Sequence, residues 1–193
     1  MQVLESDPDV MAALKANTAR QHQEVERLMP FFDEHLSLGI YRETLVAFLG
    51  FYEPVEDELT SISGWQTVGL DPTRRLRANL LRTDLRALGL PESIFPSLPR
   101  CEDLPELDNC FDGLGCLYVL EGSTLGGQLI ARELHRRLGI DQQSGAAFFH
   151  SYGADVGSMW KEFCAAVRES VDTPIKLQSA VTAAKRTFAS FAA

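Results

Sequence analysis

Apolar residues recur along most of this chain at intervals of three and four positions, the spacing of one face of an α-helix. No segment shows the alternating, β-branched pattern that is typical of strands. Pro30 ends the first periodic run, and Gly89 and Gly139 end two later ones. The pattern therefore predicts an all-α fold of six or seven helices, a short one at 142–150 being optional. The others are expected at 7–28, 41–62, 72–88, 107–138, 155–171 and 174–191.

Prolines refine these boundaries. Pro54 lies inside the second run, where it predicts a kink or a break. Pro72 and Pro174 stand in the first turns of their helices, and Thr173 supplies an N-cap for the last one. Residues 89–105 carry four prolines and are expected to form an irregular connection.

Length and charge narrow the class of protein. With 193 residues, 45% of them hydrophobic, the chain fits one domain with a full core, so we expect a compact single domain over 1–193. Its formal net charge of -9, without a cluster of Lys and Arg, argues against nucleic acid as a partner.

The sequence also predicts a cytoplasmic location. The first residues lack the basic start and apolar run of a signal peptide, and no stretch is apolar enough for a membrane span. The cysteines form no CxxC pair and are interpreted as reduced thiols. They are Cys101, Cys110, Cys116 and Cys164.

Glycines interrupt the helix predicted over 107–138. Gly122, Gly126 and Gly127 each cost a helix about 1 kcal/mol relative to alanine, so something must offset them. Gly115, Gly122 and Gly126 follow a spacing of seven and four residues, which places them on one helix face. Two explanations are open at this point: close packing against another helix, or a flat ligand lying against bare backbone.

His22 is the candidate metal ligand on the first helix. Glu26 follows at i+4, within reach of the ring nitrogen that a metal leaves free, and Lys15 lies two turns earlier on the same face. An ordinary surface pair is the alternative. No zinc or di-iron ligand set accompanies His22, so a metal there must bring further ligands, as haem does.

Two segments together resemble a known family. Residues 14–26 resemble the proximal helix of haem oxygenases, and residues 122–128 resemble their distal helix. Residues 118–127 are especially similar to bacterial haem oxygenases that accompany phytochromes. Segments 41–59 and 160–163 also look like family elements, so the resemblance covers nearly the whole chain.

The resemblance implies a haem-oxygenase-like helical bundle and a role for each matching residue. His22 would ligate the haem iron, Glu26 would orient the His22 ring, and Lys15 would meet a propionate. The distal backbone contacts would come from Gly122, Gly126 and Gly127. Lys161 is a second propionate candidate, placed by its neighbour Trp160, and Tyr52 falls in the distal hydrogen-bond region or in ordinary core.

Ser123 departs from a common family pattern. Many members carry an aspartate there, which organises the water that delivers protons on the distal side. The phytochrome-associated members resemble this chain at that position. The hypothesis is that Ser123, Thr124 and the Gly122 carbonyl hold an equivalent water chain.

The resemblance further implies a reaction in which haem is both cofactor and substrate. Dioxygen and external electrons would open the ring to biliverdin with loss of carbon monoxide and iron. The chain has no GxGxxG signature, so a ferredoxin or a reductase is expected to supply the electrons. A phytochrome is a possible acceptor of the product.

Three other functions are compatible with parts of the pattern. A haem carrier or sensor on the same fold would bind haem without turnover. A thiaminase-like hydrolase would need an activated cysteine, for which the sequence shows no setting. A helical interaction module would leave His22 and the glycines unexplained as a pair.

Overall fold

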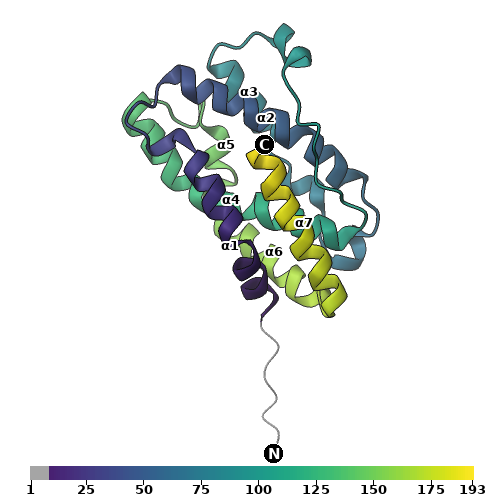
Figure 1. Cartoon of the computed structure of the whole chain (residues 1–193). Helices are drawn as coiled ribbons and strands as arrows, with labels where there is room; N and C mark the ends of the chain where they lie inside the picture. The colour runs from purple at the N-terminus through teal and green to yellow at the C-terminus, as the bar shows by residue number, and fades with distance from the viewer. Residues whose placement is uncertain (1–8) are drawn as a thin grey trace, which may run out of the picture.

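A computed structural model describes residues 9–193, and within this range the protein contains helices and no strands (Figure 1). The all-α prediction is confirmed. The helices are α1 (Val10–Leu28), α2 (Leu38–Ser61), α3 (Ala78–Ala87), α4 (Cys110–Leu138), α5 (Ala147–His150), α6 (Val156–Ser170) and α7 (Pro174–Ala192).

Local side chains set several helix ends. The carboxylate of Asp9 accepts a hydrogen bond from the backbone N–H of Met11, and α1 begins between them. Residues 7 and 8, where the first helix was expected to begin, lie outside the described residues. Ser37 caps α2 three residues earlier than the pattern predicts, and Thr173 caps α7 as expected.

α2 continues through Pro54, so of the two alternatives expected there a break is excluded. A second prediction at a proline was wrong. The helix expected over 72–88 is divided into a 3-10 turn, Pro72–Arg75, and α3. The division has a physical cause: the carboxylate of Glu56 accepts the backbone N–H groups of Arg77 and Ala78, which starts α3 there.

The connection between α3 and α4 is irregular, as expected, except for a 3-10 segment at Glu92–Ser97. The short helix near 142–150 is the single turn α5.

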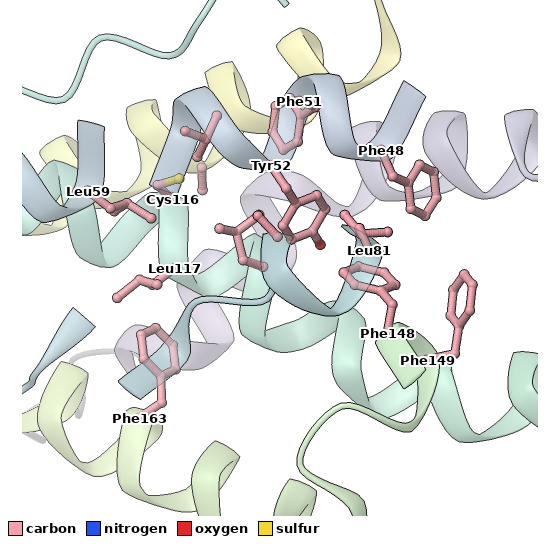
Figure 2. Packing of buried hydrophobic residues seen from close by; sticks show 14 of the residues in the cluster. Phe48, Phe51, Tyr52, Leu59, Leu81, Cys116, Leu117, Phe148, Phe149 and Phe163 are labelled. Atoms are coloured by element: carbon pink, nitrogen blue, oxygen red, sulfur yellow. The ribbon is translucent and has the colours of Figure 1, made fainter. Parts of the chain in front are cut away.

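The core is continuous around α4 and is rich in aromatic side chains. α7 lies against both α4 and α1 (Figure 1). Figure 2 shows Phe48 and Tyr52 of α2 on the same side of the core as Phe148 and Phe149 of α5. The rings of Tyr52 and Phe148 meet edge to face at 5.0 Å. This aromatic cluster forms the inner end of the cavity described below.

None of the helices within residues 9–193 combines the length and apolarity that crossing a bilayer requires. The four cysteines are free thiols.

Candidate functional site

A cavity of about 640 Å³ lies between α1 and α4, a volume within the roughly 300–1,000 Å³ typical of small-molecule sites. Its lining is mainly apolar and aromatic, with a few polar groups. α2 and α5 contribute its inner end, and Trp160 of α6 and Phe188 of α7 close further parts of the wall. The cavity can therefore hold a large, mostly apolar molecule.

The α1 wall carries His22, the predicted metal ligand, and Glu26, its predicted partner. His22 Nδ1 lies 3.5 Å from Glu26 Oε2, and the two side chains are 58% and 64% exposed. The His22 ring also meets Phe188 edge-on, with centroids 6.0 Å apart. Because Nδ1 faces the carboxylate, Nε2 is the nitrogen left to bind a metal. Lys15 lines the same wall and is exposed, so its ammonium group can reach an anionic edge of a ligand.

The opposite wall is α4, where two glycines leave space. A Cβ added to Gly126 would meet nothing within 4 Å, and one added to Gly122 would only touch Trp160 at 3.9 Å. Both residues line the cavity. Bare backbone is therefore presented to whatever occupies it.

Two other glycines of α4 have a different neighbour. A Cβ on Gly115 would overlap the carbonyl oxygen of Ala180 in α7, and one on Gly127 would lie 2.6 Å from the carbonyl oxygen of Phe149. At these positions glycine allows close packing of backbones. Gly127 also borders the cavity, so the packing role leaves its predicted ligand contact a prediction.

Polar groups meet behind the glycines. Ser123 Oγ donates to the carbonyl of Leu120 at 2.6 Å and lies 3.4 Å from the hydroxyl of Tyr52. Arg77 Nη2 donates to Ser123 Oγ at 3.2 Å, to the Tyr52 hydroxyl at 3.4 Å and to the Leu120 carbonyl. Burial raises the pKa of Tyr52, so this phenol stays protonated.

Thr124 contributes little to this cluster. Its buried hydroxyl donates to the carbonyl of Glu121 at 2.7 Å, within its own helix. The Ser123 hydroxyl likewise donates its proton to a backbone carbonyl. Tyr52 and Arg77 are therefore the hydrogen-bond donors of this cluster.

Glu56 holds Arg77 in place from behind. Its Oε1 accepts the backbone N–H of Arg77 at 2.6 Å and that of Ala78 at 3.1 Å. Burial raises the pKa of the Glu56 carboxyl to about 7, although these N–H groups oppose the shift. The carboxyl thus binds backbone rather than the Arg77 guanidinium.

Nearly all of the expected site residues gather around this one cavity. Lys161 is the exception, because it is exposed on α6 and does not line the cavity, whereas its neighbour Trp160 does. Tyr52 is both core and polar contact, since its ring packs on Phe148 while its hydroxyl faces Ser123. Those that line the cavity are Lys15, His22, Glu26, Tyr52, Gly122, Ser123, Gly126 and Gly127.

Arg77 and Glu56 are site residues that the sequence did not predict. A signal for Glu56 was present, because this charged residue occupies the apolar stripe of its helix, four positions after Tyr52. No comparable signal marked Arg77, which lies within a run that is interpreted as ordinary amphipathic helix.

Comparisons with known protein sequences find haem oxygenases. The model of the haem oxygenase family ("Heme oxygenase") matches residues 9–193. A heme oxygenase of Xanthomonas campestris pv. campestris is 32% identical over 148 residues, which are 74% of this chain and 78% of that protein.

Two solved structures share the fold at 20% sequence identity. Heme oxygenase from Leptospira interrogans superposes with a TM-score of 0.76 and covers 96% of this chain and 97% of its own. The NO- and CO-bound heme oxygenase from Neisseria meningitidis has a TM-score of 0.73, covering 96% of this chain and 89% of its own.

Proposed function

The chain belongs to the haem oxygenase family, and we propose that the cavity between α1 and α4 binds haem with His22 as the iron ligand. As a family member it is an oxidoreductase that cleaves haem. The observation that carries the proposal is that His22 and the open glycines Gly122 and Gly126 face one apolar cavity from its two sides.

The residues present fit haem in shape and in charge. Open space at Gly122 and Gly126 lets a flat ring approach the backbone, where any side chain would intrude. The lining is apolar enough to cover the ring, and exposed Lys15 is placed to meet its carboxylates. Glu26, whose Oε2 lies 3.5 Å from His22 Nδ1, is placed to orient the imidazole.

Bound haem supplies the iron at which dioxygen reacts, while haem is itself the substrate whose ring is opened. The chain contributes the surroundings of that iron. The backbone of α4 at Gly122 and Gly126 would lie against bound haem, and the aromatic cluster would exclude water from its end of the cavity. Tyr52 and Arg77 present hydrogen-bond donors to the distal side, and Ser123 accepts one of them. Together they take the part that an aspartate has in other members.

The remaining partners belong to the same proposal. Electrons come from a separate donor such as a ferredoxin or a reductase, since the chain has no dinucleotide-binding signature. Biliverdin is released and is available to an acceptor such as a phytochrome. A cytoplasmic location is supported by the four free cysteines, and a single domain over 1–193 by the family match across 9–193.

The test is turnover of a hemin complex. Purified protein is mixed with hemin and reduced in air by ferredoxin and its reductase, and the visible spectrum and carbon monoxide are followed. Conversion to biliverdin by wild type, and its loss in His22→Ala, is the expected result. Tight hemin binding without ring opening would instead identify a haem carrier or sensor.

A further inference from the structure

Arg77 is a buried positive charge at the wall of the cavity. The residue is 2% exposed and lines the cavity. No carboxylate within residues 9–193 forms an ion pair with its guanidinium, which instead contacts two hydroxyls and one carbonyl. A buried charge that no counter-charge contacts directly is costly, and a ligand that brings the opposite charge into contact reduces that cost.

The nearby carboxylates have other partners. Glu121 is bound by Arg75 Nη1 at 2.6 Å and by the Tyr152 hydroxyl at 2.7 Å. Glu56 is bound to the backbone N–H groups of Arg77 and Ala78. Neither carboxylate neutralises the Arg77 guanidinium by direct contact.

The guanidinium also retains a free donor. Arg77 Nε is buried and has no hydrogen-bond partner among the described residues. The central carbon of the guanidinium lies over the rings of Tyr52 and Phe148, 5.3 and 5.2 Å from their centroids. These contacts hold the guanidinium in a fixed orientation without satisfying Nε.

We propose that Arg77, together with Tyr52 and Ser123, forms a binding site for a small anion on the distal side of the cavity, which the anion occupies as a ligand of ferric haem. The inference rests on the proposed haem binding. The anion accepts hydrogen bonds from the guanidinium and the Tyr52 phenol, directly or through one water.

The proposal distinguishes this chain chemically from members with a distal aspartate. A carboxylate at the position of Ser123 repels an anion, whereas the Arg77 guanidinium beside Ser123, which stays protonated, attracts it. A neutral ligand of ferric haem gains nothing from the positive charge. Anionic and neutral ligands therefore separate the role of Arg77 from a general change in the cavity.

The experiment is titration of the ferric hemin complex with sodium fluoride and, separately, with imidazole, followed in the visible spectrum. In Arg77→Met we expect fluoride to bind at least about tenfold more weakly, the loss expected for one hydrogen bond to a charged group, while imidazole affinity stays within about twofold. Arg77→Gln keeps a donor for the Leu120 carbonyl without the charge, and serves if Arg77→Met does not fold. Arg132→Gln is the control, because it removes one exposed positive charge from α4 outside the cavity.

Each outcome decides the proposal. Unchanged fluoride affinity in a folded Arg77 variant that binds hemin would overturn the anion site and leave the proposed function intact. A parallel loss of fluoride and imidazole affinity would also overturn it, since it indicates a collapsed cavity. If wild type does not bind hemin, the proposed function itself fails, and the anion site fails with it.

Discussion

The glycines on one face of α4 fall into two parts with different neighbours. At Gly115 the face packs directly on the backbone of α7, where an added Cβ would overlap the carbonyl oxygen of Ala180. Two and three turns later the same face opens at Gly122 and Gly126 onto the cavity, and an added Cβ meets almost nothing. The intrinsic cost to the helix is similar at all three positions, about 1 kcal/mol each. Close backbone packing offsets it at Gly115, whereas at Gly122 and Gly126 no such packing exists and we propose that the open space serves a ligand.

This difference shows why the two explanations of the glycine spacing were not exclusive. Spacing along a helix determines which residues share a face, but it carries no information on what lies against that face. Ala180 is 65 positions away from Gly115 in the sequence, and its carbonyl arrives only when α7 packs on α4. The predictions below separate the packed part of the face from the open part.

The largest effect is expected from filling the open part. Gly126→Leu places a large side chain where the haem ring would lie, so hemin affinity should fall at least tenfold. Stability in the absence of hemin should not fall, because leucine favours helix by up to about 1 kcal/mol over glycine. Hemin titration and thermal unfolding measure both quantities.

The control is Gly157→Leu. Gly157 also has nothing within 4 Å of an added Cβ, but it lies on α6 outside the cavity lining. Equal loss of hemin affinity in both variants would contradict the assignment of the open face.

Gly115→Ala should lower the stability of the protein, whereas Gly126→Leu lowers its hemin affinity. Because the added methyl overlaps backbone rather than a flexible side chain, α4 and α7 must move apart, and we expect destabilisation of about 1–3 kcal/mol. In a chain of this length that corresponds to a Tm lower by several degrees. An unchanged Tm would show that the two helices do not pack as closely as described.

Glu56 tests the polar side of the cavity through pH. Its pKa is raised from 4.5 to about 7 in the folded protein, so between these values the folded state holds a proton that the unfolded chain has released. Stability from this group therefore falls as pH rises through that window. The difference in unfolding free energy between wild type and Glu56→Gln should decrease by on the order of 1–3 kcal/mol from pH 4.5 to 7.

Denaturant unfolding at several pH values measures this difference. Asp57→Asn is the matched control, since it removes the adjacent, exposed carboxylate. A difference that is flat across the window for Glu56→Gln would mean that this carboxyl titrates normally.

The smallest and sharpest comparison uses two adjacent residues. Gly126→Ala should stabilise the protein without hemin by up to about 1 kcal/mol, since its methyl meets nothing. Gly127→Ala should destabilise it by about 1 kcal/mol, because its methyl would lie 2.6 Å from the Phe149 carbonyl. Shifts of the same sign in the two Tm values would break the distinction between the packed and the open positions.

The sequence predicted those parts of the fold and of the site that depend on local spacing. His22 and Glu26 are one turn apart on a single helix, so their contact follows from the sequence alone. The N-cap at Thr173 and the glycine face of α4 are local in the same sense.

The polar cluster behind the glycines could not be predicted in this way. Tyr52, Arg77 and Ser123 come from α2, the start of α3 and α4, and only the packing of these elements brings them together. The break before α3 that turns Arg77 inward depends on Glu56, a contact across 21 residues. The sequence carried one sign of this contact, because Glu56 is a charged residue within the apolar stripe of its helix.

The iron ligand is the most direct test of the proposed haem site between α1 and α4. The visible spectrum of the hemin complex is recorded for wild type, for His22→Ala and for His22→Ala with added imidazole, with His35→Ala as the exposed-histidine control. We expect His22→Ala to lose the histidine-ligated spectrum and added imidazole to restore it. His35→Ala should match wild type. A wild-type spectrum in His22→Ala without imidazole would show that haem is held elsewhere or by another ligand, and would contradict the site described for α1 and α4.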